Sequence, residues 1–127
     1  MKPNPSTSND ISFDDFKSQI LQDYETAVMS RQCSLMGRRE VLSGKAKFGI
    51  FGDGKELPQL AMARAFQDGD FRSGYYRDQT FMTAIGQYSP KHMFSSLYGD
   101  PELEREPSSG SRQMMNHFGT RFLNKDG

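Results

Sequence analysis

The chain has a single cysteine and no excess of charge of either sign. Because Cys33 is alone, an internal disulfide and a cysteine-rich metal motif are both excluded, which favours a reducing compartment. Sixteen basic side chains balance sixteen acidic ones. No overall field therefore attracts the chain to nucleic acid or to an anionic membrane, and any phosphate binding must be local.

The sequence also lacks long apolar runs. None approaches the ~18 residues of a membrane span, and residues 1–10 have neither the apolar core of a secretory signal nor the arginine-rich pattern of an import signal. We therefore expect a soluble, cytoplasmic protein. Cys33 has no histidine close to it in sequence, since the two histidines are His92 and His117. A catalytic thiol is therefore not predicted.

The length of 127 residues fits one domain. Residues 1–10 are rich in proline, serine and asparagine and are predicted to be a disordered leader. Residues 11–127 form the remaining unit, within which the acidic, proline- and serine-rich composition of 99–112 predicts a mobile loop.

Apolar spacing and capping residues predict four helices and one strand. Ser12 is followed by Asp15 in a capping arrangement, and the large apolar residues after it recur at helical spacing. We interpret this aromatic stripe as a docking face for other structure. Residues 33–44 are mixed and fit a short second helix or a turn. The predicted helices span 13–31, 59–67, 78–85 and 90–98, and the predicted strand spans 71–75.

The end of that strand opens onto Tyr75, Tyr76 and Arg77. An arginine held by stacking presents a planar fork of donors to phosphate or carboxylate. The competing interpretation is a solvated Arg77 paired with Asp78. The glycine-punctuated loop 47–56 lets the backbone approach another group closely, as in loops that line sites.

One triplet in this loop, Gly52-Asp53-Gly54, is similar to the magnesium motif of thiamine diphosphate enzymes. That motif is followed by paired asparagines, and the window after this triplet contains none. We therefore reject the triplet as the cofactor motif, and a single carboxylate does not predict a magnesium site.

A different succession of motifs carries a family resemblance. Gly54-Lys55-Glu56, an alanine-rich helix, Gly69-Asp70 and Tyr76-Arg77 resemble, in order and spacing, the α-type half of thiamine diphosphate-dependent 2-oxo acid dehydrogenases. The resemblance covers roughly residues 14–120. It implies an α/β fold class, namely the N-terminal part of a thiamine diphosphate-binding fold in which helices are followed by the first strands of a parallel sheet.

The resemblance also implies site residues and a substrate. Tyr76 and Arg77 match the pair that approaches the cofactor diphosphate, and Tyr75 lies where a neighbouring side chain joins them. Ile50 stands where pyruvate-type members have a histidine, so it would line the substrate pocket of a branched-chain enzyme acting on 3-methyl-2-oxobutanoate. A pyruvate or acetoin dehydrogenase of the same family stays open. So do a non-enzymatic interaction domain and a binder of single-stranded nucleic acid using Phe48, Phe51, Tyr75 and Tyr76.

Several family motifs are absent. The groups that bind magnesium, the glutamate that activates the cofactor and the catalytic histidines would all lie beyond this sequence. We therefore expect an N-terminal piece of a longer chain, with no catalytic and no metal-binding residue of its own, and inactive alone. The implied partners are a β-type half or subunit and a lipoyl-bearing acyltransferase.

Overall fold

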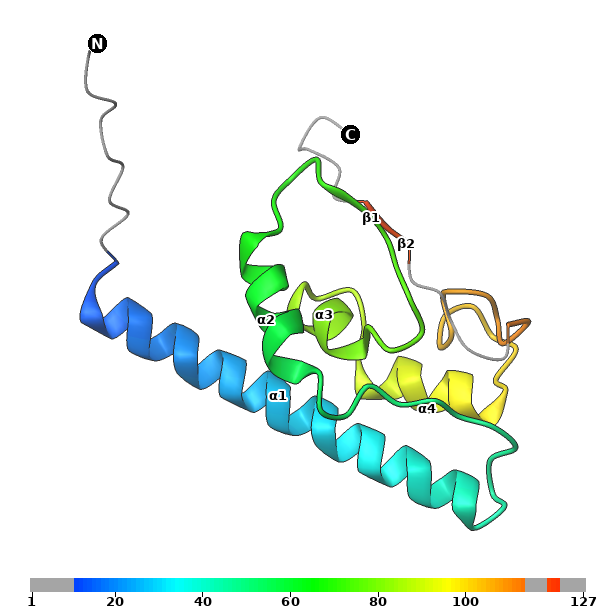
Figure 1. The fold of residues 1–127 in the computed structure, drawn as a ribbon. Coiled ribbons are helices and arrows are strands. Elements are labelled where there is room, and N and C mark those ends of the chain that lie inside the picture. The colour runs from blue at the N-terminus through cyan, green and yellow to red at the C-terminus, as the bar shows by residue number, and fades with distance from the viewer. Residues whose placement is uncertain (1–10, 114–118, 122–127) are drawn as a thin grey trace.

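The structure is a computed structural model that describes residues 11–113 and 119–121. The disordered leader predicted for residues 1–10, and His117, lie outside the described residues. Figure 1 shows a mostly helical arrangement in which α2 and α3 lie over the middle of the long helix α1, with α4 beside them. In chain order the elements are α1 (Phe13–Leu42), α2 (Glu56–Ala65), β1 (Phe71–Ser73), α3 (Gln79–Ala84), α4 (Pro90–Tyr98) and β2 (Gly119–Arg121).

Helix α1 begins where its capping residues predict. The Ser12 hydroxyl accepts a hydrogen bond from the backbone N–H of Asp15 at 3.1 Å. The helix then continues past Arg31 to Leu42, so the separate short helix or turn expected over 33–44 is wrong. Most residues in this stretch are good helix formers, and the chain turns only at Gly44, whose φ is 77°.

Helix α2 begins and ends earlier than predicted, since it spans Glu56–Ala65 and the predicted range is 59–67. The Glu56 carboxylate accepts hydrogen bonds from the backbone N–H of Gly54, at 3.0 Å to its nearer oxygen, and this contact fixes the entry to the helix. The helix ends at Ala65 because Phe66 adopts an extended backbone and places its ring edge-on to Phe81 at 5.2 Å.

The core lies where α3 meets α1, α2 and α4. Phe81 of α3 is fully buried, and Met82, Tyr88 and Met93 pack with it. Helix α4 begins at Ser89-Pro90 as predicted, since the Ser89 hydroxyl accepts from the backbone N–H of His92. No helix in the described part of the chain is both long and apolar enough to cross a membrane.

The predicted strand is present but shorter, over Phe71–Ser73, and its pairing differs from the expectation. It pairs antiparallel with β2, with Phe71 opposite Arg121 and Ser73 opposite Gly119. A parallel partner requires a crossover connection that brings the chain back in the same direction, whereas β2 returns in the opposite one. Within the described residues the only sheet is therefore this two-stranded antiparallel pair, and the expected parallel sheet stays a prediction.

The segment predicted as a mobile loop, 99–112, forms a series of turns around one acidic side chain. Glu106 is fully buried, and its carboxylate accepts from the backbone N–H of Ser109 at 2.9 Å and of Ser111 at 2.8 Å. Hydrogen bonds from several backbone N–H groups compensate a carboxylate for the loss of its contacts with water. The mobility of this segment stays a prediction.

Candidate functional site

Two segments distant in sequence meet at the candidate site. The glycine-punctuated loop 47–56, called the glycine loop below, approaches the turn at Tyr76-Arg77 that follows β1. The approach is so close that a Cβ atom on Gly52 would lie 2.5 Å from the Arg77 carbonyl oxygen. Only glycine permits this approach. Beside it, the Ile50 carbonyl accepts from the side-chain amide of Gln79 at 3.4 Å. The loop and the turn therefore form one unit that brings Ile50 near the predicted anion-binding residues.

The two tyrosines of the turn are paired. Their ring centroids are 3.9 Å apart, and the Tyr75 hydroxyl donates to the Tyr76 hydroxyl at 2.7 Å. The bond to Tyr76 raises the pKa of Tyr75 above its ordinary value, so this phenol stays protonated at neutral pH. Next to them, the Arg77 guanidinium carbon lies 5.3 Å from the centre of the Tyr76 ring. The structure thus places Tyr75, Tyr76 and Arg77 together, and their predicted role in binding the cofactor stays a prediction.

Arg77 does not pair with Asp78. The carboxylate of Asp78 is taken by Arg72, at 2.6 Å, and by the backbone N–H of Tyr75, also at 2.6 Å. Arg72 in turn lies over the Phe81 ring at 4.7 Å. Among the described residues Arg77 makes no ion pair. The competing interpretation from the sequence is therefore wrong, because a different arginine neutralises Asp78.

Two buried glutamines hold this turn, and no pattern in the sequence indicated them. The Gln79 side-chain amide donates to the Tyr76 carbonyl at 2.7 Å. The Gln59 amide donates to the Arg77 carbonyl at 2.9 Å and accepts from the backbone N–H of Phe81 at 2.9 Å. Glutamine is mostly exposed in proteins, so only the packing of α2 against α3 identifies these two as site residues.

The glycine loop is also tied to α1 by two ion pairs. Asp53 pairs with Arg38 at 2.6 Å, and Glu56 receives two bonds from Arg31, at 2.7 and 2.9 Å. Hydrogen bonding from Arg31 lowers the pKa of Glu56 to about 2. The Arg38 side chain is half-exposed and paired. In the part of the chain that the structure describes, no three His, Cys, Asp or Glu side chains gather as a metal site.

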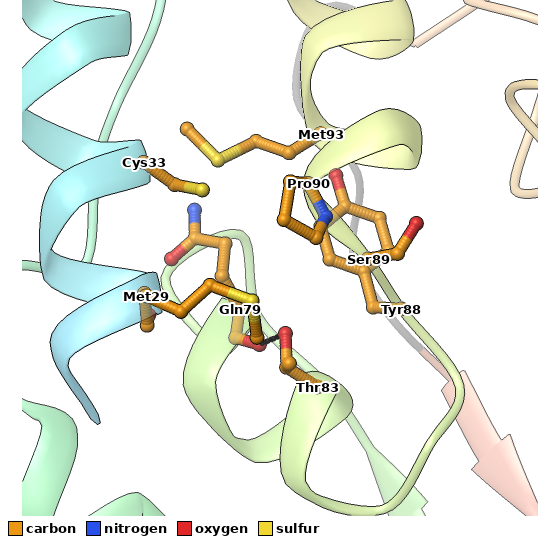
Figure 2. A pocket seen from close by; sticks show the side chains of 9 residues that line it. Met29, Cys33, Gln79, Thr83, Tyr88, Ser89, Pro90 and Met93 are labelled. Carbon is orange, nitrogen blue, oxygen red and sulfur yellow. Dashed lines mark hydrogen bonds between the residues drawn. The ribbon is translucent and has the colours of Figure 1, made fainter. Parts of the chain in front are cut away.

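A small pocket lies between α1, α3 and α4 and is lined in part by Gln79, which also holds the turn (Figure 2). Its cavity volume is about 10 Å³, far below the roughly 300–1,000 Å³ of ligand pockets. Burial raises the pKa of the Cys33 thiol that lines it, the opposite of what a nucleophilic thiolate requires. The pocket therefore gives no support to a catalytic cysteine.

The turn and the loop together can recognise an anion. Arg77 supplies a permanent positive charge without an acidic partner among the described residues, and the tyrosine pair supplies hydroxyl groups beside it. Ile50 is a half-buried apolar residue whose carbonyl is bonded to Gln79, the residue that also holds the turn. Such a combination suits a ligand with a phosphate or carboxylate group joined to an apolar part.

Comparisons with known proteins show the family of the chain. Residues 24–127 match the family described as the dehydrogenase E1 component. This match covers most of the chain, and the chain therefore belongs to that family. The chain is 32% identical over 103 residues to the 2-oxoisovalerate dehydrogenase subunit alpha of Bacillus subtilis (strain 168). The aligned region is 77% of this chain but 29% of that relative. No solved structure matches.

Proposed function

We propose that this chain is part of a 2-oxo acid dehydrogenase and that its Tyr76-Arg77 turn holds the diphosphate of thiamine diphosphate. The observation that carries the proposal is the Arg77 guanidinium, which is stacked on Tyr76 and has no ion pair among the described residues. In a member of the dehydrogenase E1 family, a charge held in this way suits a cofactor phosphate.

The residues present fit one side of the cofactor. Arg77 can donate to diphosphate oxygens through its planar fork, while the Tyr75–Tyr76 pair supplies hydroxyl groups next to that fork. When bound, thiamine diphosphate supplies the carbon centre on which a 2-oxo acid loses carbon dioxide. The role of these residues is to bind and orient the cofactor, and magnesium is held by groups outside this sequence.

The substrate we propose is a branched-chain 2-oxo acid such as 3-methyl-2-oxobutanoate. Two features support it: Ile50 is apolar and lies beside the turn, and the Bacillus relative is named for 2-oxoisovalerate. An apolar wall favours a branched aliphatic group but discriminates only modestly against one that is a methylene shorter. The second candidate is pyruvate, which replacement of Ile50 by histidine would favour.

The partners we propose follow from the family. A β-type half or subunit completes the cofactor site, and a lipoyl-bearing acyltransferase receives the acyl group. We place the assembled enzyme in the cytoplasm. The 127-residue chain alone is expected to be inactive, because Arg77 and its neighbours contact one side of a diphosphate only, and catalysis needs several groups fixed together.

The test uses the dehydrogenase that carries this chain, purified with its β-type subunit. Arg77→Ala should weaken thiamine diphosphate binding by about tenfold or more, since hydrogen bonds to charged groups contribute roughly 1.5–3 kcal/mol. Arg39→Ala, which removes an exposed arginine near the end of α1, is the matched control and should leave affinity unchanged. Equal affinity in the Arg77 variant, or decarboxylation of neither 2-oxo acid, would overturn the proposal.

Turnover of 3-methyl-2-oxobutanoate and pyruvate by the same preparation tests the substrate. We expect the branched acid to be preferred and Ile50→His to shift the preference towards pyruvate. A preference for pyruvate in the unmodified enzyme would contradict the branched-chain assignment while leaving the cofactor assignment intact.

A further inference from the structure

The side chain of Gln59 connects Arg77 to helix α3. It lies on α2, is 7% exposed, and uses both ends of its amide on backbone groups. The nitrogen donates to the Arg77 carbonyl and the oxygen accepts from the Phe81 N–H, each at 2.9 Å. One side chain therefore fixes the separation between the carbonyl of Arg77 and the first turn of the helix that follows it.

This bridge replaces a cap that α3 does not have. Asp78 stands at the N-cap position but makes no capping bond, because its carboxylate is bound by Arg72 and by the Tyr75 N–H. The first N–H groups of a helix need partners from outside the helix. Gln59 supplies one from α2, so the orientation of α3 and that of the turn depend on the same amide.

We infer that Gln59 is a positioning residue for Arg77, acting on cofactor affinity through the backbone of the turn and not by contact with the cofactor. The inference rests on the proposed function, in which Arg77 holds the diphosphate. Without Gln59, the Arg77 carbonyl would lose its buried donor and turn towards water. Because the backbone of Arg77 would then shift, its guanidinium group would no longer be held in its present position.

Gly52 further restricts the position of the Arg77 carbonyl that Gln59 holds. The Arg77 carbonyl is contacted both by the Gln59 amide and by the backbone of Gly52, where a Cβ atom would be 2.5 Å away. A hydrogen bond and a close contact together restrict the carbonyl more than either does alone. Removing the hydrogen bond from Gln59 leaves only the contact with Gly52. That contact limits how closely the Arg77 carbonyl can approach Gly52 but does not fix the direction in which the carbonyl points.

The test compares Gln59→Leu with two control variants in the dehydrogenase that carries this chain, purified with its β-type subunit. Thr80→Val removes the buried 2.6 Å hydrogen bond between Ser30 and Thr80, which holds α3 to α1 without touching the turn. Gln67→Leu makes the same chemical change at an exposed position just after α2. Thiamine diphosphate affinity, the KM for 2-oxo acid at saturating cofactor and the Tm are measured for each.

We expect Gln59→Leu to weaken thiamine diphosphate binding about tenfold while the KM for 2-oxo acid stays within about twofold. Thr80→Val should lower the Tm and leave cofactor affinity unchanged, and Gln67→Leu should change neither. If Gln59→Leu does not fold, Gln59→Glu takes its place. Its carboxylate still accepts from Phe81 but cannot donate to the Arg77 carbonyl, so the same loss of affinity is expected.

A double-variant cycle separates positioning from general destabilisation. In an Arg77→Ala background, Gln59→Leu should weaken cofactor binding by less than about twofold more, because the group it positions is gone. Additive losses, or unchanged affinity on loss of the Gln59 donor, would overturn the inference. If Arg77→Ala itself leaves affinity unchanged, the proposed function fails instead, so the two failures are distinguishable.

Discussion

The two halves of α1 differ in burial: large apolar residues are exposed in both, with Leu42 at 81%, but buried residues occur only in the second half. In the first half the large apolar residues are exposed: Phe13 is 77% exposed and Tyr24 is 68% exposed. In the second half the buried residues are small, with Ser34 only 2% exposed and Gly37 also buried. The half with the more obvious hydrophobic pattern is therefore the one that the described residues leave uncovered.

The difference shows that close approach can position a helix where an apolar stripe does not. At Gly37 a Cβ atom would lie 2.4 Å from the ring of Phe51, so this helix surface accepts an aromatic ring directly. About two helical turns before Gly37, the Ser30 hydroxyl is hydrogen-bonded to the Thr80 hydroxyl at 2.6 Å. Small and hydrogen-bonded residues thus hold the loop and α3, which carry the candidate site. The exposed stripe stays a predicted docking face.

The largest effect on the free energy of unfolding is expected at the most tightly packed position in the second half of α1. Gly37→Leu would force the Phe51 ring and the glycine loop away from α1, and overpacking of this kind costs roughly 1–3 kcal/mol or more. We expect a loss of about 3 kcal/mol in the free energy of unfolding, measured by urea denaturation. Glu25→Leu, at an exposed position of the first half, should change it by less than about 0.5 kcal/mol. Equal effects would remove the contrast between the halves.

A smaller loss is expected from the ion pair that ties α1 to α2. Glu56→Gln removes the charge that receives two bonds from Arg31. Because Arg31 remains half-exposed to water, the cost should be about 2 kcal/mol and not that of a fully buried pair. Asp23→Asn breaks the exposed pair with Arg64 at 2.8 Å and should cost less than about 1 kcal/mol. Urea denaturation of both variants at neutral pH checks the difference.

The same pair predicts a pH dependence. Folding lowers the pKa of Glu56 from 4.5 to about 2, so the folded state binds this proton less readily than the unfolded state. The resulting stabilisation is fully present above pH 4.5 and is lost as the pH falls through the folded pKa. The stability gap between the unmodified chain and Glu56→Gln should therefore shrink between about pH 4.5 and pH 2. A gap that stays constant over that range would show that the carboxylate is not stabilised by Arg31.

Local signals in the sequence predicted much of this architecture. Ser12 with Asp15 marked the start of α1, Ser89-Pro90 marked the start of α4, and both starts are confirmed. The glycine loop was predicted to approach another part of the chain, and Gly52 does approach Arg77. These features depend on residues adjacent in sequence or on glycine geometry, which short patterns carry.

Features that depend on distant partners could not be predicted. Arg72 rather than Arg77 pairs with Asp78, and the Arg72 side chain also lies over Phe81 of α3. Gln59 reaches Arg77 because α2 packs beside α3. The antiparallel pairing of β1 likewise depends on residues 119–121. Hydrophobic periodicity in the first half of α1 indicated a helix correctly but gave no information on what covers it.

The smallest effect on the free energy of unfolding is expected from the exposed aromatic stripe in the first half of α1. Phe16→Ser and Tyr24→Ser replace one side chain by another of similar helix propensity, so a change in stability would report lost packing rather than lost helix. Both residues are exposed. We therefore expect the double variant to change the free energy of unfolding of this chain by less than about 0.5 kcal/mol. Self-association, measured by sedimentation, should decrease because a patch of apolar surface is removed. A loss above about 1.5 kcal/mol would mean that the stripe is already buried in solution, and the difference in burial between the two halves of α1 would no longer hold.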